Sequence, residues 1–134
     1  MPHENKIGKQ VVDAAINLHR NLGPGLLETV YEVVLARELE KRGFSVARQV
    51  PVPIQYDGIH FDEGFRADII VADKVILELK SVENTLPVHK KQLLTYLRLR
   101  GLKLGYLLNF GSAMMKDGIR RVIDGTLEED GKSR

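Results

Sequence analysis

The sequence contains no cysteine, and this absence excludes disulfides, thiolate zinc sites and a cysteine nucleophile. Any bound metal must therefore use oxygen or histidine ligands. The sequence also lacks low-complexity tracts and any apolar run long enough to cross a membrane, so no membrane partner is expected. The opening residues, MPHENKIGKQ, have no apolar core of a signal peptide, and we expect a cytoplasmic location.

A strong excess of one charge is missing as well. The formal net charge is +2 over 134 residues. This mildly basic charge permits a nucleic-acid partner, but proteins dedicated to binding nucleic acid usually carry a larger excess of positive charge. With 43% hydrophobic and 28% charged residues, the chain fits a single folded domain spanning residues 1–134. Residues 1–4 and about 125–134 are expected to be frayed ends.

Two helices are predicted at the start of the chain. Apolar residues recur at helical spacing from about Asn5 to Leu22, and GPG at 23–25 then breaks the helix. A second helix is predicted from about Leu26 to Arg42, with Gly43 as its C-cap. We expect its inward side chains to be Leu27, Val30, Tyr31, Val34 and Leu35.

The hydrophobic period then changes to two, which predicts strands. Apolar residues alternate over 44–56, and Pro51 and Pro53 on the opposite parity favour an edge strand or a bulge. Asp57-Gly58 marks a turn into a short strand. The strands expected after this turn lie at 59–61, 65–71 and 75–82.

The last part of the chain alternates again between helix and strand. A helix is predicted within 83–101, capped by Asn84 or Thr85 and ended by Gly101. A buried strand at 104–111 and a possible short strand at 117–123 follow. The order is α-α-β-β-β-α-β, an α/β fold with a mixed central sheet flanked by helices.

Three charged residues interrupt the apolar strands FRADIIVADKVILELK, although an unpaired buried charge is costly. Glu78 and Lys80 lie two apart and share a face of the sheet. An Ala72–Lys74 connection would place Asp68 opposite Glu78, and a five-residue connection or a register shift of two would place it opposite Lys80. A two-residue turn would place Asp68 on the other face.

Two facing carboxylates repel each other unless a cation lies between them. Mg²⁺ is bound in this way, by one or two carboxylates together with water and a substrate phosphate. Lys80 beside them could stabilise an oxyanion or help to deprotonate an attacking water. The structural alternative is an internal salt bridge between Lys80 and either Glu78 or Asp68.

Asp68 followed by Glu78-Leu79-Lys80 resembles the D…(D/E)xK signature of the PD-(D/E)XK nuclease superfamily, although Ala67 replaces the proline of its name. The element order also resembles the restriction-endonuclease-like core of that superfamily. GLLETVY at 25–31 resembles the motif of the GxxExxY proteins, a branch of the superfamily. QLLTY at 92–96 resembles the QxxxY motif of its RecB-like exonucleases.

The resemblance implies a nuclease that hydrolyses phosphodiester bonds, of DNA more than of RNA, with Mg²⁺ or its substitute Mn²⁺. Asp68, Glu78 and Glu28 would hold the metal, and Lys80 would activate the water. Gln92 and Tyr96 would position the nucleic acid or the ligands. Phosphate contacts are expected from further basic residues, namely Arg66, Lys90 and Lys91. A homodimer that clasps a duplex is also compatible with so small a core.

Several of these residues have a structural alternative. Glu28 is favourable in a first helical turn without any catalytic role. Tyr31 is expected in the core, Gln92 and Tyr96 could pack their helix on the sheet, and Arg66 could pair with a carboxylate. The alternative for the whole domain is a catalytically silent nuclease-like fold that binds nucleic acid or a protein.

Overall fold

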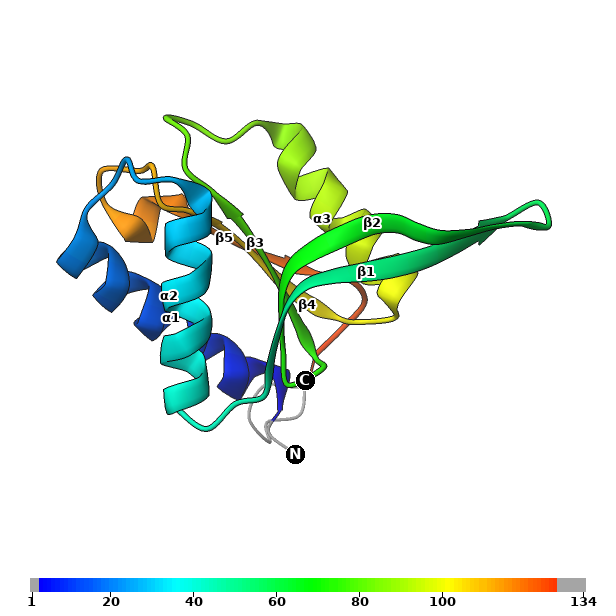
Figure 1. Cartoon of the computed structure of the whole chain (residues 1–134), viewed down its shortest axis with the longest axis horizontal. Helices are drawn as coiled ribbons and strands as arrows, with labels where there is room; N and C mark the ends of the chain where they lie inside the picture. The colour runs from blue at the N-terminus through cyan, green and yellow to red at the C-terminus, as the bar shows by residue number, and fades with distance from the viewer. Residues whose placement is uncertain (1–2, 128–134) are drawn as a thin grey trace.

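The structure, a computed structural model, describes residues 3–127 (Figure 1). Its elements, in chain order, are α1 (Glu4–Leu22), α2 (Glu28–Lys41), β1 (Val46–Tyr56), β2 (Ile59–Val71), β3 (Val75–Lys80), α3 (Pro87–Arg100), β4 (Leu104–Asn109), the 3₁₀ helix η1 (Met115–Gly118) and β5 (Ile119–Ile123). The predicted element order is confirmed, including the final strand. Most of the expected frayed ends, residues 1–2 and 128–134, lie outside the described residues, and Glu4 already begins α1.

The sheet is mixed, as predicted, with the strand order β1-β2-β3-β4-β5. The only parallel pair among the described strands is β3 with β4, and α3 is the crossover between them. β1 lies at one edge of the sheet, which accommodates Pro51 and Pro53. The position of the prolines therefore predicted the edge correctly.

One strand, β2, replaces the two that were predicted at 59–61 and 65–71. The pairing with β1 shifts between Val52, opposite Phe65, and Ile54, opposite Phe61. Residues 62–64 therefore face Pro53 alone, in a bulge that keeps the strand continuous. The gap between the two predicted strands, residues 62–64, is this bulge.

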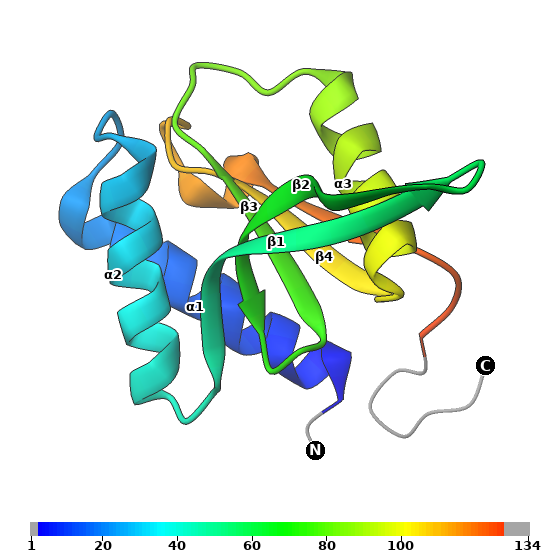
Figure 2. The ribbon, with the colours of Figure 1, turned by 45° about the vertical axis from the view of Figure 1, so that its right-hand side comes forward.

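Helices cover both faces of the sheet (Figure 2). α1 and α2 pack on one face, where Ile69, Leu77 and Leu79 join the larger buried cluster. α3 packs on the other face, where Leu93 and Leu97 contact a smaller cluster that includes Ile70 and Ile76. Alternate residues of β2 and β3 thus serve opposite cores, as the strand period requires.

The inward face of α2 differs in part from the prediction. Tyr31 and Leu35 are buried, but Leu27, Val30 and Val34 are exposed. Leu27 is the N-cap residue and lies before the helix, so it does not belong to the buried stripe. The remaining buried residues of α2 are Glu32, Ala36 and Leu39.

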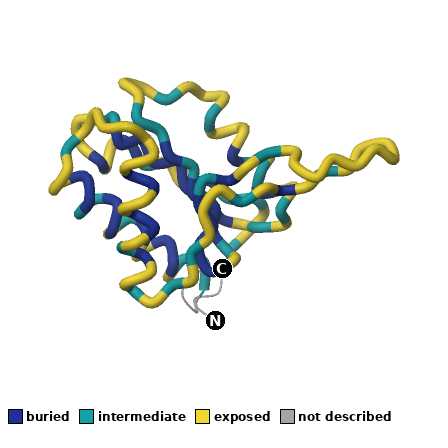
Figure 3. The backbone as a smooth tube through the Cα atoms, viewed as in Figure 1, coloured by how far each residue is buried: buried dark blue, intermediate teal, exposed yellow. Residues whose placement is uncertain are grey.

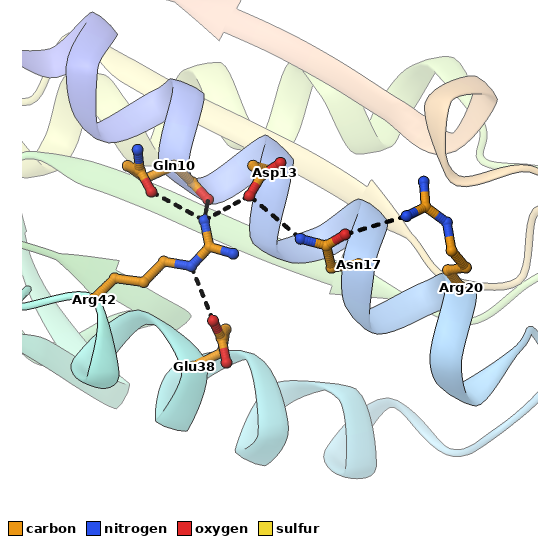
Figure 4. Close-up of polar contacts among 6 residues, drawn as sticks. All are labelled: Gln10, Asp13, Asn17, Arg20, Glu38 and Arg42. Carbon is orange, nitrogen blue, oxygen red and sulfur yellow. Dashed lines mark hydrogen bonds and ion pairs between the residues drawn. The ribbon is translucent and has the colours of Figure 1, made fainter.

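Arg42, at the end of α2, holds α2 against α1 (Figure 4). Its guanidinium donates to Asp13 Oδ2 at 2.8 Å and Gln10 Oε1 at 2.9 Å on α1, and to Glu38 Oε2 at 2.9 Å on α2. Since Asp13 and Glu38 share one cation, the two helices are fixed side by side. This fixes the position of α2 over the sheet.

The cap of α3 was predicted incorrectly. The N-cap residue is Leu86, not Asn84 or Thr85, and its backbone N–H donates to His89 Nδ1 at 3.0 Å. Pro87 occupies the first turn, where its missing N–H costs nothing.

Within residues 3–127, no helix is both long and apolar enough to cross a membrane.

Candidate active site

The connection between β2 and β3 sets which charged residues face one another. Val71 pairs with Val75, Ile70 with Ile76 and Ile69 with Leu77, around a turn at residues 72–74. Continuing this register by one residue places Asp68 opposite Glu78. The odd-numbered connection required for a shared face is therefore present.

Beyond the Ile69–Leu77 pair, the hydrogen bonds between β2 and β3 join backbone N–H groups to side chains instead of to backbone carbonyls. The N–H of Asp68 donates to Glu78 Oε2 at 3.0 Å, and the N–H of Leu79 donates to Asp68 Oδ2 at 2.9 Å. β2 then turns away from β3, and we call this divergence, marked by Asp68 and Glu78, the fork (Figure 2). Both carboxylates are held in place by the backbone of the opposite strand.

The fork disfavours two negative charges. Burial, followed by the charge of Asp68, raises the pKa of Glu78 to about 8. Burial also raises the pKa of Asp68, and the carboxylates of Glu32 and Glu28 add to that rise. A cation at the fork would relieve this repulsion.

The donor atoms fit a hard divalent cation. Asp68 and Glu78 each use one carboxylate oxygen for a backbone N–H, and within residues 3–127 no hydrogen bond or ion pair engages Asp68 Oδ1 or Glu78 Oε1. Two oxygens therefore remain for a metal such as Mg²⁺. In the same part of the chain, no three histidine or acidic side chains gather closely enough to form a metal cluster.

Lys80, at the end of β3, acts on both carboxylates without pairing with either. Its charge lowers the pKa of Asp68 and Glu78, opposing the larger effect of burial. Among the described residues, however, no ion pair of 4.0 Å or less involves Lys80. The alternative of an internal salt bridge at these residues is not found, and the ammonium group is available to a ligand.

Glu28 is exposed and is the first residue of α2. The loop before it is fixed by Tyr31, whose hydroxyl donates to the Gly23 carbonyl at 2.6 Å and accepts the Leu26 N–H at 3.0 Å. The Tyr31 ring is buried and stacks on Phe110 at 4.4 Å, so Tyr31 belongs to the core as expected. Gly25 has a φ of 96°, which favours glycine.

A further contact brings this loop to the fork. The Ser81 hydroxyl donates to the Leu26 carbonyl at 2.5 Å, directly after Lys80 in the chain. The start of α2 is thus attached to the end of β3. The Gly25 and Tyr31 positions of the GxxExxY-like motif hold a loop, and the glutamate between them contributes to the electrostatic field at Asp68.

A family model described as the PD-(D/E)XK nuclease superfamily matches residues 5–122. The chain belongs to this nuclease superfamily. No curated protein matches the chain. The match runs from the first turn of α1 into β5, so the restriction-endonuclease-like core predicted from the sequence is confirmed. The narrower likeness to the GxxExxY proteins remains a resemblance.

The two residues of the QxxxY-like motif differ from each other in their position relative to the fork. Tyr96 stacks on Phe65 of β2, with ring centroids 4.0 Å apart and planes 4° apart. Its pKa is raised by burial and then by the charges of Glu78 and Asp68, so the phenol lies near the fork. Gln92 is exposed one turn earlier on α3.

The basic residues expected to contact phosphate are exposed, but they do not gather at one place. Arg66 makes a two-point ion pair with Glu63, with nitrogen–oxygen distances of 2.6 and 3.0 Å. Lys90 and Lys91 line a groove between α3 and β5. Tyr96 contacts β2 from the opposite flank of α3, so these lysines lie on the side away from the fork.

Glu32 is the acidic residue that the sequence analysis missed. It is only 6% exposed, and Arg48 Nη2 lies 2.8 Å from its Oε2 while the Gln49 side chain donates to its Oε1 at 2.7 Å. Its charge raises the pKa of both Asp68 and Glu78. The only signal in the sequence was an acidic residue one turn after Glu28, next to Tyr31.

Proposed function

We propose that this protein is a metal-dependent nuclease that hydrolyses phosphodiester bonds of nucleic acid, with DNA as the expected substrate. One observation carries the proposal: Asp68 and Glu78 are fixed together at the fork, each with one oxygen left for a ligand. Membership of the nuclease superfamily supports the reaction class. The unpaired Lys80 beside the carboxylates supports an anionic substrate.

Asp68 and Glu78 would hold Mg²⁺, with Mn²⁺ as a substitute. When bound, such an ion polarises a phosphoryl oxygen and lowers the pKa of water. Because the described residues contain no cluster of three acidic or histidine groups, water and substrate phosphate would complete the ligand set. Glu28 would add negative charge on the α2 side of the fork, where its field already reaches Asp68.

The other residues of the fork would act on the substrate. Lys80 would orient the attacking water and offset charge that develops on the scissile phosphate. Tyr96 holds its hydroxyl near the carboxylates through its stack on Phe65 and would position the nucleic-acid backbone. Gln92, exposed on α3, would contact the backbone one helical turn away. Arg66 would contribute only after it leaves Glu63.

The direct test is cleavage of single-stranded DNA, double-stranded DNA and RNA by the purified full chain with Mg²⁺ or Mn²⁺. We expect cleavage that EDTA abolishes and that Lys80→Ala reduces at least a hundredfold, since general acid–base groups contribute about 10²–10⁴-fold. Lys103→Ala, an exposed lysine elsewhere, is the matched control. If none of these substrates is cleaved by the folded protein, the silent nuclease-like domain is the better account.

A further inference from the structure

The β1–β2 hairpin extends far beyond the body of the molecule (Figures 1 and 3). We call its outer part, residues 54–64, the arm. Residues 55–64 are all exposed, and they include Tyr56 at 79%, Ile59 at 57% and Phe61 at 48% exposure. Three large apolar side chains thus project into solvent on a two-stranded ribbon.

An isolated two-stranded ribbon of this kind is only marginally stable in water. The arm is nevertheless well specified: Tyr56 pairs with Ile59 across a tight turn in which Asp57 and Gly58 have φ values of 51° and 77°. These values match the type I′ turn that suits a twisted hairpin. A preformed apolar ribbon without intramolecular cover is suited to contact with another macromolecule.

The charge of the arm indicates which partner it fits. Asp57, Asp62 and Glu63 are its acidic residues, and it contains neither lysine nor arginine. Arg66, just beyond the arm, is paired with Glu63, and His60 Nε2 lies 3.1 Å from Asp62. This acidic surface would repel phosphates, so insertion of the arm into nucleic acid is disfavoured. It fits a basic surface with an apolar floor.

The same chain carries such a surface on the α3/β5 groove. The groove has a volume of about 530 Å³, and it is lined by Pro87, Lys90, Lys91, Leu94, Arg121, Val122 and Ile123. Its apolar floor comes from Leu94 and Val122, and its rim is basic. Within residues 3–127, neither Lys90 nor Lys91 has a carboxylate within 4.0 Å.

We propose that the arm of one copy docks in the α3/β5 groove of a second copy, and that the exchange is reciprocal. Ile59 and Phe61 would cover the apolar floor, while Asp57 and Asp62 would approach the cations of the rim. Two identical arm–groove contacts related by a two-fold axis form a closed dimer. In this arrangement Lys90 and Lys91 bind the arm of the partner copy, and the fork on the other flank of α3 stays accessible to substrate.

Charge reversal of each surface tests the proposal in the full chain. The arm variant is Asp62→Lys with Asp57→Asn, because asparagine removes the charge and still suits the positive φ of the turn, and the groove variant is Lys90→Glu with Lys91→Glu. All four positions are exposed, so circular dichroism should show both variants folded. Because like charges across an interface disfavour binding strongly, each variant alone should raise the dimer dissociation constant about a hundredfold or more.

Mixing the two variants should restore the dimer. In the mixed pair, the lysine arm meets the glutamate groove and the native arm meets the native groove, so both contacts are complementary. Sedimentation velocity measures dimer in the wild type, monomer in each variant and heterodimer in the equimolar mixture. A monomeric wild type at 100 µM, or two monomeric variants that do not associate, would overturn the proposal.

Nucleic-acid binding by the groove is the competing outcome. In that case the groove variant would lose DNA affinity, the arm variant would keep it, and mixing would restore nothing. This pattern contradicts arm docking and returns Lys90 and Lys91 to phosphate contact. Since the readout is mass rather than cleavage, the result is independent of whether the fork is an active nuclease.

Discussion

Glu78 Oε2 accepts the backbone N–H of Asp68 at 3.0 Å, so one carboxylate of the proposed metal pair is held by the backbone of the other. The N–H of Leu79 in turn holds Asp68 Oδ2 at 2.9 Å. These two bonds connect β2 and β3 at the residue pair where the strands begin to diverge. The fork is therefore rigid on its closed side, and the remaining carboxylate oxygens are held in place for a ligand.

Neutralising either carboxylate is expected to abolish cleavage while the fold is retained. Asp68→Asn and Glu78→Gln preserve shape, but they remove the charge that binds a divalent cation. Cleavage rates in Mg²⁺ should fall at least about a thousandfold, as expected for loss of a metal-held water. Glu83→Gln, an exposed residue after β3, is the matched control and should behave as wild type.

The metal-free protein should lose stability as pH rises. The folded pKa of Glu78 is about 8 against an ordinary 4.5, so the native state retains a proton that the unfolded chain releases between those values. Linkage then requires the free energy of unfolding to fall from about pH 4.5 to about pH 8. The loss attributable to Glu78 is on the order of a few kcal/mol.

Urea unfolding in EDTA at several pH values measures this effect. Glu78→Gln cannot ionise, so its stability relative to wild type should increase over the same pH range. Added Mg²⁺ should reduce the difference, because the cation favours the ionised carboxylates. A constant difference between wild type and Glu78→Gln from pH 5 to pH 8 would contradict the raised pKa.

Glu32 is expected to matter for both stability and the field at the fork. Glu32→Ala removes the partner of Arg48 and Gln49, and should destabilise the fold by about 1.5–3 kcal/mol, the range for hydrogen bonds to charged groups. Arg48 remains partly hydrated, which limits the loss. Glu40→Ala, exposed on the same helix, should cost less than about 0.5 kcal/mol.

Glu32→Gln separates the charge of Glu32 from its shape. Because the charge of Glu32 raises the pKa of both fork carboxylates, its removal should shift the pH at which metal binding appears to a lower value. Metal titrations at several pH values follow this shift. An unchanged pH profile would mean that Glu32 has only a structural role.

Tyr96→Phe separates packing from chemistry on α3. The variant keeps the stack on Phe65 and should unfold within about 0.5 kcal/mol of wild type. Cleavage should fall about tenfold or more if the hydroxyl positions substrate, an effect of 1.4 kcal/mol. Gln92→Ala at the exposed position should leave stability unchanged, and its cleavage rate shows whether Gln92 takes part.

Local sequence patterns predicted most of the fold. Helical spacing before Gly23, the Asp57-Gly58 turn and the prolines of β1 each depend on neighbouring residues, and the structure confirms all three. The errors arose where tertiary contacts decide the outcome. β2 stays continuous because β1 absorbs a bulge, and α3 begins at Pro87 because His89 caps it.

The candidate site was predictable in its strands but less so in its helices. Strand parity predicted that any odd-numbered turn puts Asp68 on the face of Glu78 and Lys80, and the three-residue length of the turn then places it opposite Glu78. No local pattern distinguishes Glu32, which is buried, from Glu28, which is exposed, because burial depends on partners 16 and 17 residues away in β1. Lys90 and Lys91 were assigned to phosphate from charge alone, which does not tell which flank of α3 they occupy.

Calorimetric titration of the wild-type chain with Mn²⁺, alongside Glu78→Gln and the control Glu83→Gln, tests the central claim most directly. We predict saturable binding to the wild type and to Glu83→Gln, and loss of binding in Glu78→Gln. Equal binding by all three proteins would place the metal elsewhere. Absence of binding to the wild type would contradict a metal-dependent site at Asp68 and Glu78.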